Sequence, residues 1–136
     1  MSTYPNPNPV FGLAPIFGCG VLGTANTALT APGGGTVATI ITATVNSLIH
    51  VVRFKMTVTS SAGMWRLWHY DGATYYLIDE INIPVVTVSA TQGAYAFDYY
   101  VPGGILLPEG HSLRATTEKS EAAVACAYGE TLGRAA

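Results

Sequence analysis

Charged side chains are scarce in this sequence. Asp, Glu, Lys and Arg make up 10% of its 136 residues, whereas hydrophobic residues make up 49%. Soluble domains usually contain about 25% charged residues, and a small domain has much surface to keep hydrated. We therefore expect one domain whose surface is partly buried against other chains, as in a component of an assembly.

Basic residues are few and scattered, and the formal net charge is −2. Binding to nucleic acid needs clustered Lys and Arg that neutralise phosphates and release counterions. Of the six basic residues, only Arg53 and Lys55 could share one face of a strand. The sequence therefore predicts no direct contact with DNA or RNA.

Motifs for catalysis, metal binding and membrane insertion are also missing. No Walker loop, nucleophile elbow or zinc pattern is present, and no apolar run is long enough to span a bilayer. The N-terminus lacks the basic region of a secretory signal. We expect neither an enzyme nor a membrane protein, with no catalytic residue, no metal site and no cofactor.

The three histidines, His50, His69 and His111, do not have the spacing of a metal site. His50 falls on the predicted apolar face of its strand, where a hydrogen-bonded core histidine is the favoured interpretation. His69 is interpreted as an ordinary strand residue, with a position at an interface as the alternative. His111 lies in a predicted turn and is expected to be solvated.

Only two cysteines are present, Cys19 and Cys126. Two cysteines do not define a disulfide framework. The favoured interpretation is that both are small buried hydrophobic residues. A bridge between the N-terminal segment and the last strand is the alternative.

The N-terminal segment is uncharged, since no charged side chain precedes Arg53. The Pro–Asn alternation at 5–9 cannot form a helix, because each proline lacks an amide donor. A free tail usually carries charge. We therefore predict an extended arm over residues 1–24 that lies on a neighbouring subunit or larger surface, with a disordered tail as the alternative. Its predicted interface residues are Tyr4, Val10, Phe11, Leu13, Ile16 and Phe17.

Residues 25–136 are expected to form one β-domain. No window shows a sustained helical period, and β-branched and aromatic residues dominate. The expected strands lie within 36–45, 48–60, 65–70, 74–83, 94–101, 113–117 and 122–128, with a short strand and loop in 85–93 and turns at 102–104 and 108–110. About eight antiparallel strands at this spacing predict a β-sandwich or jelly roll.

Side-chain alternation assigns faces to two of these strands. On the second expected strand, the side chains predicted to face the core are Leu48, His50, Val52, Phe54, Met56 and Val58. On the strand within 74–83, Asp79 and Glu80 point to opposite sides of the sheet, so they cannot act as a paired acid and base. Asp71 and Gly72 form the hairpin turn before that strand.

Aromatic residues concentrate in three of the predicted strands. Exposed rings could stack on sugars, whereas buried rings would belong to the core or to a subunit interface. The second interpretation is favoured. The candidate interface or ligand residues are Trp65, Trp68, Tyr76, Tyr95 and Tyr99.

Several turn and strand signals together match a known class of proteins. These signals are Tyr70-Asp71-Gly72, Glu80 to Pro84, Pro102 to Gly110 and Leu113 to Thr116. Over about residues 36–132 the chain resembles small jelly-roll virion proteins of tailed bacteriophages. The class has no motif of functional residues to transfer.

The resemblance implies a structural part of a phage particle, and most specifically a capsid cement or decoration protein at the capsid surface. Such proteins commonly form homotrimers that bind the major capsid protein and reach across its joints with extended arms. A protein of this kind would be made in the host cytoplasm. The alternative is a receptor- or glycan-binding module of a phage tail or fibre.

Overall fold

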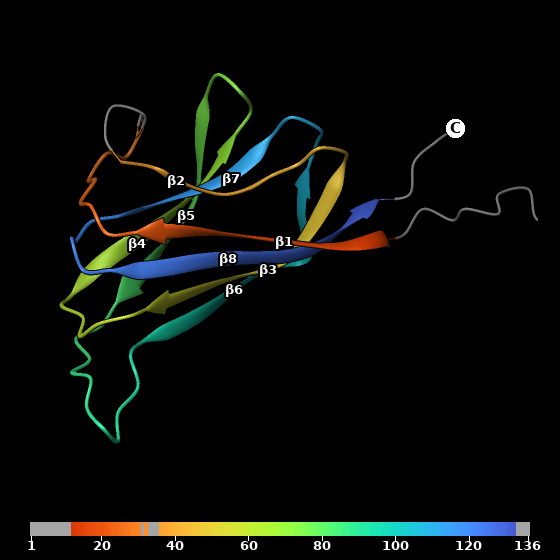
Figure 1. Ribbon diagram of the computed structural model, residues 1–136. Helices are drawn as coiled ribbons and strands as arrows, with labels where there is room; N and C mark the ends of the chain where they lie inside the picture. The colour runs from red at the N-terminus through yellow and green to blue at the C-terminus, as the bar shows by residue number, and fades with distance from the viewer. Residues whose placement is uncertain (1–11, 31, 33–35, 133–136) are drawn as a thin grey trace, which may run out of the picture.

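The structure is a computed structural model that describes residues 12–30, 32 and 36–132 (Figure 1). The strands are β1 (Gly12–Leu22), β2 (Ala38–Thr42), β3 (Ser47–Met56), β4 (Gly63–Tyr70), β5 (Tyr75–Ile83), β6 (Ala96–Leu107), β7 (Ser112–Thr117) and β8 (Ala123–Leu132). The described residues contain no α-helix. The predicted all-β fold of about eight antiparallel strands is therefore confirmed.

The strands form two four-stranded sheets, which we call sheet A (β1-β8-β3-β6) and sheet B (β2-β7-β4-β5). All neighbouring strands within each sheet are antiparallel. This order arises when one long antiparallel ribbon wraps into a jelly roll, so that the first strand pairs with the last. Figure 1 shows the result: β1 and β8 lie side by side although they come from opposite ends of the chain.

The core lies between the inner faces of the two sheets. Phe54 of sheet A stacks on Trp65 of sheet B, with ring centroids 5.0 Å apart. The larger fully buried side chains around this pair include Ile49, Val52, Met56, Leu67, Leu107 and Leu113. Their removal from water supplies the main driving force for joining the sheets.

Residues 12–22, which were predicted to belong to the arm, form strand β1 at the edge of sheet A. The strand packs closely on sheet B, since a Cβ at Gly20 would lie 2.8 Å from the carbonyl oxygen of Thr39. Pro15 is tolerated because the missing amide of a proline costs little at a sheet edge. The expected boundary at residue 24 therefore falls after a strand of the sandwich, and residues 1–11 lie outside the described residues.

A register shift in β3 changes the core face that was predicted there. Between Ile49 and Val51 the pairing with β6 and with β8 slips, and such a slip exchanges the inward and outward side chains. Ile49 is fully buried, whereas His50 is exposed. The prediction is confirmed for Val52, Phe54 and Met56 and is wrong for Leu48, His50 and Val58.

Strand β6 is longer than predicted, because Pro102-Gly103-Gly104 forms a bulge rather than a turn. Residues 101–104 stand between the β6 residues that pair with Val51 and with Ile49. Gly103 and Gly104 have φ angles of 83° and 86°, which glycine adopts without strain. The apolar run after the glycines therefore continues the same strand.

The short strand predicted within 85–93 is wrong. The segment between β5 and β6 contains only isolated bridges, one of which joins Val86 to Ser60. The predicted number of strands agrees with the structure because β1 takes the place of this strand.

The hairpin turn at Asp71 is confirmed. The Asp71 Oδ1 atom accepts hydrogen bonds from the amides of Ala73 and Thr74, at 2.9 Å and 2.7 Å. These two amides lower the pKa of the Asp71 carboxyl, because they stabilise its charged form. Gly72 has a φ of 102°, so the residue type and the turn agree.

Candidate functional site: the outer face of sheet A

One row of side chains crosses all four strands on the outer face of sheet A. Tyr128 of β8 is paired with Phe17 of β1 on one side and with Val51 of β3 on the other. Val51 is in turn paired with Tyr100 of β6. Paired residues lie on the same face of a sheet, so these four residues form a continuous stripe, which we call the aromatic row.

The aromatic row is open to solvent. Phe17 is 70% exposed, Tyr100 is 66% exposed and Tyr128 is 44% exposed. The rings of Phe17 and Tyr128 stack at an interplanar angle of 15°, with centroids 6.2 Å apart. Single exposed hydrophobic residues are ordinary, but contiguous ones on a monomer usually mark a surface for binding.

Leucine and valine side chains extend this apolar surface beyond the row. Leu106 of β6 is 56% exposed and is paired with Leu48. At the other side of the row, Val21 of β1 is 75% exposed and is paired with Val124 of β8. The apolar surface therefore covers parts of every strand in sheet A.

A disulfide and an ion pair lie directly beside the aromatic row. Cys19 of β1 is bonded to Cys126 of β8, its register partner. Cys126 is also paired with Arg53 of β3, whose Nη1 atom lies 2.9 Å from an Asp98 carboxylate oxygen. The favoured prediction of two buried, unbonded cysteines is wrong, since Cys19 is exposed and both sulfurs form the bridge.

His50 lies at the opposite border of the row. Its Nε2 atom is 3.2 Å from a carboxylate oxygen of Glu130, and its side chain is 51% exposed. The interpretation of His50 as a core histidine is therefore wrong, and the register shift in β3 is the reason. The apolar row thus runs between two polar pairs, Arg53–Asp98 and His50–Glu130.

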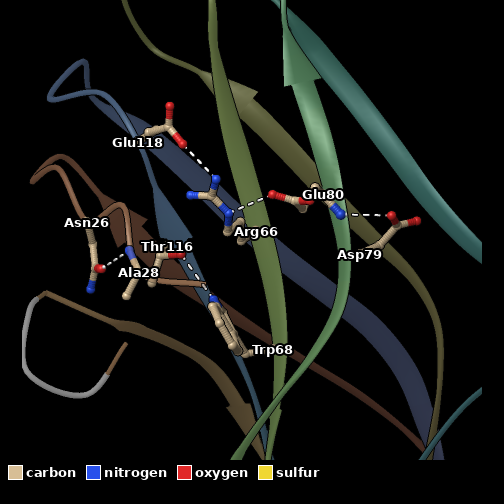
Figure 2. Close-up of polar contacts among 8 residues, drawn as sticks. All are labelled: Asn26, Ala28, Arg66, Trp68, Asp79, Glu80, Thr116 and Glu118. Carbon is tan, nitrogen blue, oxygen red and sulfur yellow. Dashed lines mark hydrogen bonds and ion pairs between the residues drawn. The ribbon is translucent and has the colours of Figure 1, made fainter. Parts of the chain in front are cut away.

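The outer face of sheet B carries a buried charge network instead. The Arg66 side chain is 6% exposed, and its Nε and Nη2 atoms bond Glu80 and Glu118 at 2.8 Å and 2.6 Å (Figure 2). Burial acts to lower the pKa of Arg66, but the hydrogen bonds and charges of Glu118 and Glu80 outweigh it and raise the pKa. Figure 2 also shows Asp79 on the side of β5 away from Arg66, as side-chain alternation predicts.

Trp68 is buried on this same side of sheet B. Its indole Nε1 donates to Thr116 Oγ1 over 3.0 Å. The segment between β1 and β2 is bonded to the edge of β7, because the Asn26 amide donates to the Thr117 carbonyl at 2.8 Å and Ala25 forms a parallel bridge with Thr117. Within the segment, Asn26 Nδ2 donates to the Pro32 carbonyl at 3.0 Å, and the Asn26 side chain accepts the Ala28 amide (Figure 2). Trp68 and Arg66 are thus buried within the single chain.

The other two histidines form a pair. His69 Nε2 and His111 Nδ1 lie 2.7 Å apart, and both side chains are partly buried, so the expectation of a solvated His111 is only partly met. Burial lowers the pKa of His69, and the nearby His111 lowers it further, whereas Asp71 acts in the opposite direction. The His69 side chain of β4 can therefore respond to acid.

The remaining candidate residues fall into different environments. Trp65 and Trp68 are fully buried, whereas Tyr76 is 54% exposed. Tyr95 and Tyr99 are partly buried and pack against the core. Of the arm residues, Ile16 also packs against the core, Phe17 is exposed, Leu13 lies in β1, and Tyr4, Val10 and Phe11 lie outside the described residues.

The described residues contain no cluster of metal ligands and no membrane-spanning helix. Among the residues that the structure describes, no group of three or more His, Cys, Asp or Glu side chains could hold a metal ion. The same part of the chain contains no helix that is long and apolar enough to cross a membrane. The apolar outer face of sheet A is therefore the candidate site with the clearest physical basis.

Comparisons with known proteins identify no family. No family model matches the sequence, and no curated protein matches it. One solved structure that resembles the chain is the cyanophage Pam1 capsid asymmetric unit, at 15% sequence identity and a TM-score of 0.41, over 95% of this chain and 94% of that chain. So low a TM-score carries no argument about function.

Proposed function

We propose that this protein is a non-enzymatic structural component of a tailed-bacteriophage virion, and specifically a capsid cement protein. Three copies form a homotrimer that binds the major capsid protein at the capsid surface and bridges neighbouring subunits. The resemblance in sequence suggests this class. The structural observation that supports it is the exposed aromatic row of sheet A.

An apolar, uncharged surface suits a protein that holds a shell together. Apolar area contributes about 25 cal/mol per Å² when it leaves water, and contacts repeated around a trimer multiply the effect of each weak contact. Aromatic residues are enriched in the buried centres of such interfaces. Tyr100 and Phe17, at 66% and 70% exposure, have this chemistry and are not covered by the described chain.

The proposal assigns separate contacts to two parts of the chain. The aromatic row packs between copies of the trimer. The uncharged residues 1–11 bind the capsid, with Tyr4, Val10 and Phe11 as their large apolar side chains. Phe17 belongs to the first contact, because it lies in the aromatic row.

The trimer contact is tested with Tyr100→Ser, which removes the exposed ring at the β6 end of the aromatic row. Loss of such a ring commonly weakens an interface by about 2 kcal/mol, or about thirtyfold. Light scattering after size-exclusion chromatography should show a trimer for the natural protein and smaller species for the variant. Tyr76→Ser is the matched control, since Tyr76 is 54% exposed on sheet B, and it should remain trimeric. A natural protein that stays monomeric at micromolar concentration contradicts the trimer.

The capsid contact is tested by deleting residues 1–11. A deletion to residue 24 would remove β1 and with it a strand of sheet A, so the cut ends before Gly12. The shortened protein should remain folded and trimeric but no longer co-sediment with capsids that lack the protein. Co-sedimentation that is unchanged by the deletion argues against a capsid-binding segment.

The alternative, a glycan- or receptor-binding module, has less support. Trp65 and Trp68 are fully buried and cannot stack on a ligand. The alternative therefore depends on Tyr76, Tyr95 and Tyr99. A glycan array in which the natural protein gives hits that Tyr99→Ala abolishes would favour it over the cement protein.

A further inference from the structure

A pocket of about 300 Å³ lies between β5 and β6, the last strands of the two sheets. It opens to solvent along this side of the sandwich, whereas on the opposite side β1 packs directly on β2. Its lining includes Asp79, Glu80 and Asn82 of β5 and Tyr95, Phe97 and Tyr99 on the side of β6.

Three aromatic rings form one wall of the pocket. Tyr95, Phe97 and Tyr99 are spaced two residues apart, so their side chains lie on the same face of the chain. Tyr95 stacks on the buried Trp65, with ring centroids 5.8 Å apart, which fixes its position. Phe97 is 38% exposed. The wall therefore offers ring surface to a ligand without a rearrangement of the core.

The opposite wall carries an acidic group without a cationic partner. The Asp79 carboxylate accepts the Glu80 amide at 2.7 Å, and no Lys, Arg or His pairs with it among the described residues. The Glu80 carboxylate is already bonded to Arg66. Burial raises the pKa of Tyr99, and the negative charge of Asp79 raises it further. No basic residue lines the pocket.

We infer that this pocket binds a basic side chain, arginine in preference to lysine, from an extended segment of a partner protein. A guanidinium group stacks on aromatic faces and bonds a carboxylate with two parallel hydrogen bonds. A neutral sugar could stack on the same rings, but it would leave the charge of Asp79 uncompensated. β5 and β6 are both edge strands, whose free backbone groups favour an extended ligand.

The inference is independent of the cement function and is tested with a short peptide. Acetyl-Ser-Val-Arg-Val-Ser-amide is titrated into the full chain and followed by amide chemical shifts in NMR. Saturable shifts are expected at residues 79–82 and 95–99, with a dissociation constant on the order of 1 mM. The peptide with citrulline, which has the shape of arginine without its charge, should bind at least about tenfold more weakly.

Asp79→Asn removes the acidic charge of the pocket that is not paired with a cation among the described residues, while keeping the size of the side chain. This variant should lose at least about tenfold in affinity for the arginine peptide. Glu109→Gln is the matched control, because it removes one negative charge from an exposed turn, and it should bind as the natural protein does. Dispersed amide signals establish that each variant is folded.

Three results would overturn the inference. The first is equal binding of the arginine and citrulline peptides, and the second is unchanged binding by Asp79→Asn. The third is that the peptide causes no shifts in the pocket, whereas neutral chitotriose shifts the same amides, which identifies a carbohydrate site instead.

Discussion

The outer faces of the two sheets differ in how they are kept from water. On sheet B, Trp68 is fully buried and Arg66 is 5% exposed. The segment that joins β1 to β2 is bonded to β7 of this sheet through Asn26. On sheet A, Phe17 and Tyr100 are 70% and 66% exposed, and no described segment lies over them.

The two outer faces therefore differ in what can bury their large side chains. Both outer faces carry large aromatic side chains, so composition alone does not decide which face is covered. On sheet B, Trp68 is buried within the described chain and contributes to the stability of the single chain. The aromatic row of sheet A can be buried only by something outside the described residues, which is why we assign association to it.

The largest effect should come from a paired test of the two faces. Trp68→Ala removes a fully buried side chain and should lower the free energy of unfolding by about 3–5 kcal/mol. Tyr100→Ala, on the exposed face, should change it by less than about 0.5 kcal/mol. Urea unfolding at one low protein concentration measures both, because association adds to apparent stability. Similar losses in the two variants would remove the distinction between the faces.

The next effect concerns the covalent link within sheet A. The Cys19–Cys126 bridge joins residues separated by 107 positions, and replacing both by Ser should lower the free energy of unfolding by about 2–4 kcal/mol. Dithiothreitol should lower the urea midpoint of the natural protein to that of the variant and leave the variant unchanged. A natural protein that is insensitive to the reductant contradicts a stabilising bridge.

The fold was predictable wherever the alternation of side chains was undisturbed. The hairpin at Asp71 and the opposite directions of Asp79 and Glu80 follow from turn chemistry and from the two-residue period of a strand. His50 was misplaced because a bulge shifts the period, and the sequence carries no local mark of it. The bulge is set by pairing with β6 and β8, which are distant in sequence.

The candidate site was predictable only in part. Phe17 was predicted to be an interface residue of an arm and not of a strand. The reason is that the prolines and glycines of residues 1–24 are unusual in a strand. Gly20 is needed where β1 packs on β2, a contact that local propensity does not reveal. The sequence does not predict Tyr100 and Tyr128 as interface residues. They join Phe17 in one row only when β6 and β8 are paired in register within sheet A.

A smaller effect should follow from loosening the segment between β1 and β2, which is bonded to sheet B. Asn26 is 8% exposed and accepts the Ala28 amide at 3.1 Å as well as bonding Pro32. Asn26→Ala should lower the free energy of unfolding by about 1–2 kcal/mol, because partners of a buried amide lose their bonds. It should also raise the quenching of tryptophan fluorescence by acrylamide, because Trp68 bonds Thr116, which precedes the Thr117 that holds Asn26. Asn46→Ala, at an exposed asparagine, should leave quenching unchanged, and equal quenching in both variants would show that the segment does not shield the tryptophans.

The smallest effect should be a dependence on pH that belongs to sheet B. The pKa of His69 is lowered from its ordinary 6.5, so the unfolded chain takes up a proton more readily than the folded one. The free energy of unfolding should therefore be constant above about pH 6.5 and fall as the pH drops below it. Urea midpoints at about pH 8 and about pH 5 measure the loss.

Two variants decide where this dependence on pH originates. His69→Gln should reduce the loss in acid, and His111→Gln should reduce it too, because the charge of His111 is one cause of the lowered pKa of His69. His50→Gln changes the histidine of sheet A, which bonds Glu130 at the border of the aromatic row. If the loss in acid persists in His69→Gln but disappears in His50→Gln, the response to acid belongs to the exposed outer face of sheet A. The assignment of the pH dependence to sheet B is then wrong.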